Sequence, residues 1–82
     1  MIEVTLISRA WCHLCHDMEA AARPLVAEYG ARLEVLDADS DPALEARYDE
    51  LVPVLLLGER EICHHFLDEA GLRRALEEAR GG

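Results

Sequence analysis

Hydrophobic and polar positions along the first half of the chain alternate in ways that predict a strand and then a long helix. Residues 2–7 are rich in β-branched side chains and partly alternate, which predicts a strand. Over residues 13–29 apolar side chains recur every three or four positions, which is typical of one helix face. Gly30 is expected to end this helix, and Pro24 to bend it because proline removes a backbone hydrogen bond.

The second half begins with a strand over residues 32–36 and an aspartate-rich turn. Asp41 is the expected N-cap of a short helix over residues 43–49, with Pro42 at its first position. Residues 54–57 form a continuous apolar run. Such a run predicts a strand covered on both faces, near the centre of a sheet.

The chain then turns at Gly58-Glu59, and residues 60–63 are expected to return as the second strand of a hairpin. Asp68 is the expected cap of a final helix that runs to about Arg80. The order is β-α-β-α-β-β-α, which predicts an α/β fold with helices on both faces of a four-stranded mixed sheet. A single domain over residues 1–80 with a short tail, residues 81–82, is the expected organisation.

Composition restricts the class of function. At 82 residues and 51% hydrophobic side chains, the chain can bury one core. A formal net charge of −9 argues against binding to nucleic acid or to anionic membranes. No signal segment or membrane span is visible, so a cytoplasmic monomer is expected. In a reducing compartment, cysteines serve catalysis or metal binding more often than structural disulfides.

The stretch Trp11-Cys12-His13-Leu14-Cys15 holds two cysteines at the expected start of the long helix. Free amide groups and the helix dipole stabilise a thiolate there, and thiol pKa values at such sites fall from about 8.5 to roughly 3.5–7.5. Arg9 and His13 would act in the same direction if they point at the sulfur. Cys12 is the expected nucleophile, and Cys15, one helical turn further on, the resolving thiol.

Two other chemistries match part of this pattern. Cys12-His13-Leu14-Cys15-His16 fits the attachment motif of c-type haem, although a strand precedes it and Met18 is too close to be the second axial ligand. A metal or iron–sulfur site built from Cys12, Cys15, Cys63 and either His64 or His65 is the stronger alternative. Otherwise Cys63 is expected to be a small apolar residue ending a strand, with both histidines in a solvated loop.

Four segments together resemble the thioredoxin superfamily, and in particular its short bacterial glutaredoxin-like domain proteins. They are residues 8–15, the aspartate-rich turn before Pro42, the pair Val52-Pro53 before an apolar strand, and the helix start at residues 67–70. The resemblance covers essentially the whole chain. It implies a thioredoxin/glutaredoxin-like fold with the first strand inside the sheet and Pro53 in a cis peptide bond facing the thiols.

The resemblance also implies an activity, thiol–disulfide exchange through Cys12 and Cys15, without a bound cofactor. The backbone of Val52, beside Pro53, is expected to pair with the disulfide substrate, and an exposed Trp11 next to the nucleophile would suit peptide docking. Arg9 matches a basic residue that neutralises a glutathione carboxylate in glutaredoxins. The expected partner is a disulfide-containing protein or a glutathione mixed disulfide, the second with glutathione as co-substrate.

Three departures from the glutaredoxin pattern bear on the co-substrate. The residues between the cysteines are His13-Leu14, whereas glutaredoxins usually have Pro-Tyr. Cys63-His64 stands where glutaredoxins carry Gly-Gly, so side chains are expected to crowd glutathione there. No buried acid behind the thiols is evident in the sequence, and Glu3 is the nearest candidate.

Overall fold

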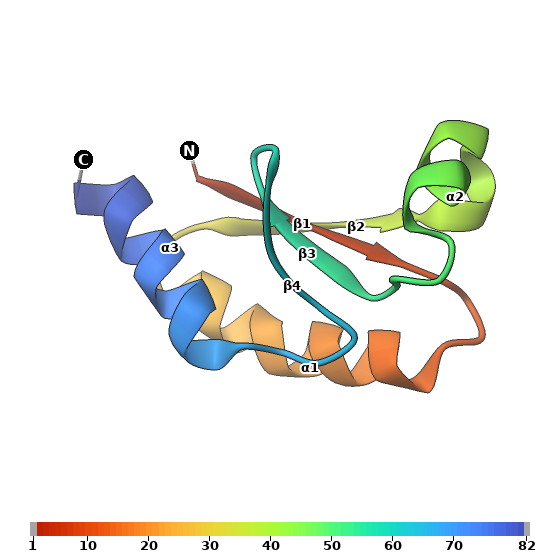
Figure 1. Ribbon diagram of the computed structural model, residues 1–82. Helices are drawn as coiled ribbons and strands as arrows, with labels where there is room; N and C mark the ends of the chain where they lie inside the picture. Colours follow the sequence, from red (N-terminus) through yellow and green to blue (C-terminus); the bar gives the residue numbers. More distant parts are fainter. Residues whose placement is uncertain (1, 82) are drawn as a thin grey trace.

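The computed structural model describes residues 2–81 and shows four strands and three α-helices (Figure 1). In chain order they are β1 (Glu3–Ser8), α1 (His13–Glu28), β2 (Arg32–Asp37), a 3₁₀ turn η1 (Ala38–Ser40), α2 (Pro42–Tyr48), β3 (Val54–Leu57), β4 (Arg60–His64) and α3 (Glu69–Gly81). The predicted order of elements is therefore confirmed. The last helix continues through Gly81, one residue further than expected, while Gly82 lies outside the described residues.

The four strands form one mixed sheet in the order β2-β1-β3-β4. β1 pairs in parallel with β2 and antiparallel with β3, where Ile7 stands opposite Val54. The apolar strand β3 lies inside the sheet, between β1 and β4, as its continuous apolar run predicted. Because β1 ends where β3 begins, the loop that carries Cys12 and the segment that carries Pro53 leave the sheet at the same end.

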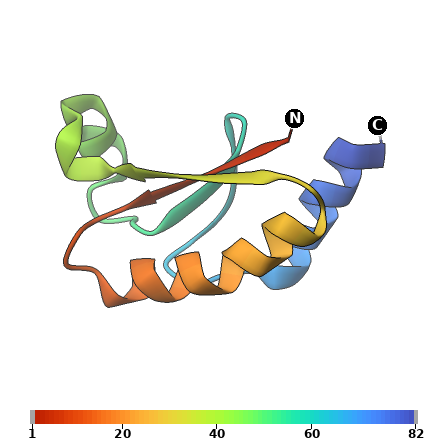
Figure 2. The ribbon, with the colours of Figure 1, turned by 180° about the vertical axis from the view of Figure 1, so that it is seen from behind.

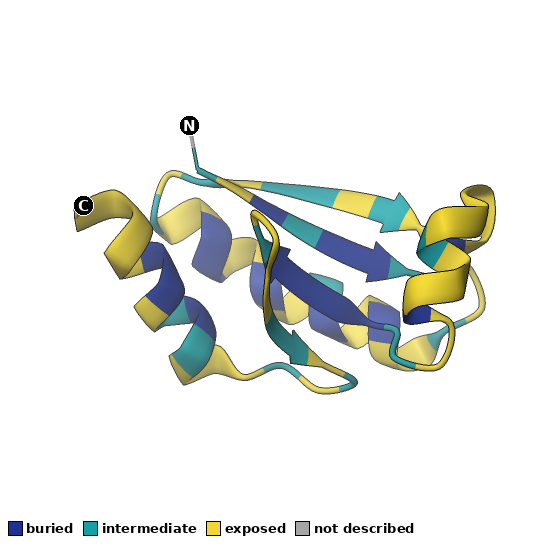
Figure 3. Ribbon diagram, turned by 45° about the horizontal axis from the view of Figure 1, so that its top comes forward, coloured by how far each residue is buried: buried dark blue, intermediate teal, exposed yellow. Residues whose placement is uncertain are grey.

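Helices lie on both sides of the sheet, with α1 and α3 across one face and α2 at one end of the other (Figures 2 and 3), and each side holds a cluster of buried apolar residues. Alternation along each inner strand sends Leu6 and Leu55 to one face and Ile7 and Leu56 to the other. The first face packs against α1 and α3 and forms the larger core, which includes Met18, Ala22, Leu25, Val26, Leu72 and Leu76. The second face is covered at one end by the short helix α2 through Tyr48. The predicted α/β fold with helices on both faces is confirmed.

The ends of α1 follow directly from its sequence. Cys12 is the N-cap, with an extended backbone, and Pro24 lies within the helix, which continues past it to Glu28. At the other end Gly30 adopts φ +68°, which glycine reaches without the steric cost of a side chain. Its N–H donates to the Ala27 carbonyl and that of Ala31 to the Val26 carbonyl, each at 3.0 Å, which closes a Schellman motif.

Aspartates begin the other two helices, as predicted. The Ala43 N–H donates to the Asp41 carboxylate at 2.9 Å with Pro42 in the first turn, and the Gly71 N–H donates to Asp68 at 2.9 Å. None of the helices in residues 2–81 is both long and apolar enough to cross a bilayer. Asp49, directly after α2, contacts Arg9 in the loop that leads to Cys12.

Candidate functional site: a disulfide at the start of α1

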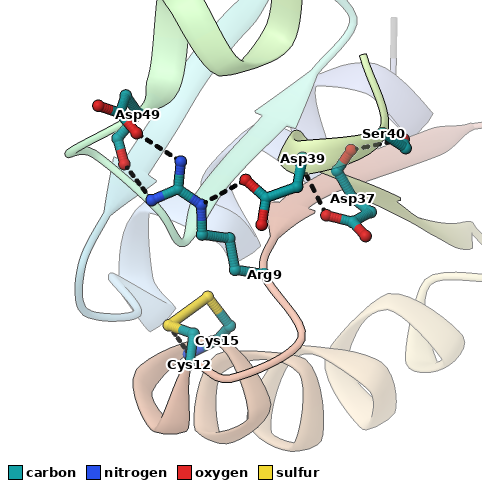
Figure 4. Close-up of polar contacts among 7 residues, drawn as sticks. All are labelled: Arg9, Cys12, Cys15, Asp37, Asp39, Ser40 and Asp49. Carbon is teal, nitrogen blue, oxygen red and sulfur yellow. Dashed lines mark hydrogen bonds and ion pairs between the residues drawn. A yellow bond between two sulfur atoms is a disulfide. The ribbon is translucent and has the colours of Figure 1, made fainter. Parts of the chain in front are cut away.

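Cys12 and Cys15 are joined by a disulfide at the first turn of α1 (Figure 4). Their Cα atoms lie 5.1 Å apart, and Cys12 Sγ also accepts a hydrogen bond from the Cys15 N–H at 3.1 Å. Cys12 is half-buried, whereas Cys15 is fully buried. The pair is therefore asymmetric: only the sulfur at the helix N-cap can be approached from solvent, and a backbone donor already points at it.

The Val52–Pro53 peptide bond is cis, as the resemblance implied. Val52 is half-buried and Pro53 buried, at the end of the sheet where the Cys12 loop also lies. The Pro53 carbonyl accepts from the His65 N–H at 2.8 Å, so the segment after β4 extends the sheet beside the proline. That Val52 pairs with a substrate stays a prediction.

Arg9 is tied to two aspartates that lie 30 and 40 residues further along the chain. Its Nε donates to the Asp39 carboxylate and its Nη1 to the Asp49 carbonyl, each at 3.0 Å, while Nη2 donates to the Asp49 carboxylate. Hydrogen bonding to Asp49, then to Asp39, raises the pKa of Arg9 above its already high ordinary value. The guanidinium sits between the two aspartates in Figure 4, with the disulfide below. Substrate binding by Arg9 stays a prediction, but its donors already have protein partners.

The aspartate-rich segment was predicted as a turn and a helix start, but not as a partner of Arg9. The Asp39 N–H and the Ser40 hydroxyl both donate to Asp37, at 2.8 and 2.7 Å, which fixes the 3₁₀ turn (Figure 4). Asp49 follows directly after α2. The density of aspartates in residues 37–49 was the available signal, but a helix cap explains such residues equally well.

The two other predicted contact residues near the thiols face solvent. Trp11 is 97% exposed, directly before Cys12, and His13 is exposed in the first turn of α1. An exposed indole has a large apolar surface that is free to contact a partner. The structure therefore leaves both side chains accessible beside the outer sulfur, and their contact with a substrate stays a prediction.

The metal-binding alternative finds no support. Nowhere in residues 2–81 do three or more histidine, cysteine or acidic side chains gather as a metal site would require. Cys63 instead packs against the core of α1 and α3, where burial raises the pKa of its thiol. His64 Nδ1 pairs with Glu61 at 2.9 Å, and His65 Nε2 lies 2.8 Å from the Glu50 carbonyl. Cys63 is thus the small, partly buried apolar residue expected of a strand end.

The loop after β4 differs from expectation in its detail. The residue with a left-handed backbone is His65, with φ +65°, so the glycine-favouring position is one residue beyond Cys63-His64. Phe66 follows it and is 70% exposed. The loop and α1 together line a groove of about 280 Å³ between Leu14 and Phe66. Phe66 was not among the predicted site residues, and its only signal in the sequence is its place directly after two histidines in a predicted loop.

A buried acid behind the thiols is absent from the part of the chain that the structure describes, since every buried side chain there is apolar. Glu3, the nearest candidate from the sequence, is exposed on β1 and faces Glu34 of β2. The hydrogen bond and charge of Glu3 raise the pKa of Glu34 above its ordinary value. Proton transfer at the disulfide must therefore use solvent or the exposed groups around it.

Known proteins are similar to this chain in sequence and in fold. The family model described as "Glutaredoxin-like domain (DUF836)" matches residues 3–77. Protein Ne2328 of Nitrosomonas europaea is 34% identical with a TM-score of 0.78, over 90% of this chain and 89% of its own. The uncharacterized protein Rv0508 of Mycobacterium tuberculosis is 32% identical over 87% of this chain and 78% of its own. Oxidized mitochondrial thioredoxin 3 of Saccharomyces cerevisiae, 19% identical over 94% of this chain and 77% of its own, has a TM-score of 0.71 and so shares the fold. With a thioredoxin-like fold and a Cys12–Cys15 pair suited to redox chemistry, the chain belongs to the glutaredoxin-like domain family.

Proposed function

We propose that the protein is a thiol–disulfide oxidoreductase whose working group is the Cys12–Cys15 pair. The observation that carries the proposal is the asymmetry of that pair. Cys12 is half-buried at the N-cap of α1, and its sulfur accepts a hydrogen bond from the Cys15 N–H. Cys15 is fully buried. A thiolate at Cys12 would gain from that donor and from the positive end of the helix dipole, so it is the better nucleophile and the better leaving group.

The reduced pair reacts with a disulfide substrate in two exchanges. The Cys12 thiolate attacks one substrate sulfur, the substrate S–S bond breaks, and the other sulfur leaves as a thiolate that takes a proton. Cys15 then loses its proton and attacks the Cys12 sulfur, which releases the second substrate thiol and forms the Cys12–Cys15 disulfide. Two electrons and two protons pass from the protein dithiol to the substrate, and the reverse sequence oxidises a substrate dithiol.

The substrate in this proposal is a disulfide-containing protein or a glutathione mixed disulfide, and no bound cofactor takes part. Trp11, His13 and the Val52–Pro53 segment are the proposed contact residues, because two are exposed beside Cys12 and the third leaves the sheet at the same end. A monomer in the cytoplasm is the proposed working form.

Reduction of insulin disulfides by the dithiothreitol-regenerated protein tests the proposal. Wild type is expected to accelerate the reaction, and Cys12→Ser to abolish that acceleration because the nucleophile is lost. Cys63→Ser is the matched control, since its thiol is partly buried and not part of the disulfide, and the substitution is expected to leave the rate unchanged. Full activity in Cys12→Ser, or loss of activity in Cys63→Ser alone, would refute the assignment.

A further inference from the structure

Large apolar side chains are exposed mainly around the thiol pair. Within residues 2–81 they are Trp11, Leu14, Val35 and Phe66, at 97%, 39%, 36% and 70% exposure. Three of these lie around Cys12. Trp11 precedes it, Leu14 lies between the two cysteines, and Phe66 lines the same groove as Leu14. Aromatic side chains exposed in this way are enriched where proteins bind other polypeptides.

Part of this apolar surface is concave and forms a groove between α1 and the β4–α3 loop. Leu14 and Met18 of α1 form one wall, and Phe66 and Leu67 of the β4–α3 loop form the other. Its volume of about 280 Å³ is at the lower end of what sites for small molecules need, and it is open to solvent. A single large side chain of a longer polypeptide fits such a groove better than a free small molecule does. Leu14 lies between the two cysteines in the sequence, so the groove begins in the same helical turn as the disulfide.

The charges beside this surface are acidic. Asp17 lines the groove, is exposed, and has no ion-pair partner among residues 2–81. The only arginine of the loop before Cys12, Arg9, is held by Asp39 and Asp49. Asp39 and Asp49, the two acidic side chains that hold Arg9, lie near the disulfide (Figure 4). A ligand with carboxylates is repelled at such a surface, and a cationic one is attracted.

We infer that the exchange partner is a polypeptide whose reactive cysteine has a large apolar neighbour, seated between Leu14 and Phe66, and a nearby arginine or lysine that meets Asp17. This inference rests on the proposed function and selects between its two substrate classes. Glutathione carries two carboxylates, one ammonium group and no large apolar side chain, so it gains nothing from the groove and is opposed by the acidic side chains. Asp17 and Phe66 are accordingly specificity-determining residues, separate from the sulfur chemistry.

Three chromogenic disulfides test this inference with the reduced protein. Two are blocked peptides with a phenylalanine next to a single cysteine, flanked by arginines in one peptide and by glutamates in the other. The third is glutathione. Each is joined through its sulfur to 2-nitro-5-thiobenzoate, whose release reports attack by Cys12. The variants are Asp17→Asn, Phe66→Ala and, as matched control for the loss of one carboxylate, Glu59→Gln in the turn at the other end of the sheet.

At low salt, the kcat/KM of wild type is expected to be about fivefold or more higher for the arginine peptide than for the glutamate peptide or the glutathione derivative. At high salt this preference is expected to be smaller. Asp17→Asn should reduce the charge preference by about two- to fivefold, the range of one exposed ion pair. Phe66→Ala should lower kcat/KM for both peptides by about fivefold while sparing the glutathione derivative. Glu59→Gln should change none of these values.

Equal rates for the three substrates would overturn the inference while leaving the oxidoreductase intact. The same conclusion would follow if Glu59→Gln changed the charge preference as much as Asp17→Asn, since net charge and not the groove would then govern selection. A reduced protein that dimerises through the groove, with dimerisation lost in Phe66→Ala, would make a second copy the occupant and also overturn it. Release from none of the three substrates would instead count against the proposed function itself.

Discussion

Arg9 joins the loop before Cys12 to Asp39 in η1 and to Asp49 directly after α2, and substituting it separates two roles. As a binder of substrate carboxylates, it would matter only for substrates such as glutathione. If it instead holds the Cys12 loop in place through the two aspartates, its loss would slow the reaction with every substrate. Arg9→Gln removes the charge but keeps a polar side chain of moderate length. Because the donors are bound to Asp39 and Asp49, we expect the second behaviour.

The size of the effect follows from the contacts. One partly exposed ion pair is worth a factor of about 1.5 to 5, and Arg9 forms two. Together they favour the docked position of the loop by about tenfold. Since misplacing a reacting group slows its reaction, Arg9→Gln should lower kcat/KM by about three- to tenfold. Asp49→Asn keeps the carbonyl contact and the Asp39 pair, so its loss should be only about twofold.

A double-mutant cycle on mixed-disulfide reduction measures this coupling. If Arg9 acts through Asp49, the double variant Arg9→Gln/Asp49→Asn should be no slower than Arg9→Gln alone, because the partner of Asp49 is already lost. Arg60→Gln is the matched control, as it breaks a single exposed ion pair, with Glu78, at the far end of the sheet. This positioning role of Arg9 is refuted if Arg9→Gln slows only the reaction with the glutathione substrate and its effect adds fully to that of Asp49→Asn.

Three further predictions concern stability and the third cysteine. Glu3 raises the pKa of Glu34, so the folded state favours protonated Glu34. The resulting contribution to folding stability is present at acidic pH and is lost as the pH rises through the raised pKa. Glu34→Gln should therefore increase the urea midpoint at neutral pH and lose that advantage below about pH 4, whereas a pH-independent difference would contradict the pairing. Leu55→Ala removes a fully buried side chain of β3 and should lower the free energy of unfolding by about 3 kcal/mol. A decrease below about 1 kcal/mol would contradict the packing of this core. Burial raises the pKa of Cys63, so alkylation of the oxidised protein near neutral pH should be several-fold slower at this thiol than after unfolding, and an equal rate would refute its burial.

The elements of the fold could be predicted because their signals are local. Asp41-Pro42, Asp68 and Gly30 mark helix ends by hydrogen bonds within a few residues, and the structure contains each of those bonds. The apolar run over residues 54–57 identified the inner strand for a similar reason, since both faces of that strand must be covered. The boundaries differed by at most one residue, within the usual uncertainty at the ends of helices and strands.

Features that depend on distant segments could not be predicted in the same way. The partners of Arg9 lie 30 and 40 residues away, and only the meeting of two loops at one end of the sheet brings them together. The left-handed backbone of His65 could not be predicted from its residue type, since histidine adopts this conformation more often than most non-glycine residues but still uncommonly. The groove requires α1 and the β4–α3 loop to lie side by side, which neither segment's own sequence specifies.

Trapping of a mixed disulfide tests the central claim, exchange at Cys12, most directly. In Cys15→Ser the resolving thiol is missing, so a peptide disulfide that reacts with the protein should remain covalently attached. Mass spectrometry of the digested adduct should place the peptide on Cys12, with Cys63 unmodified because its thiol is partly buried and its pKa is raised. An adduct found mainly on Cys63, or no adduct from a substrate that wild type reduces, would contradict the account.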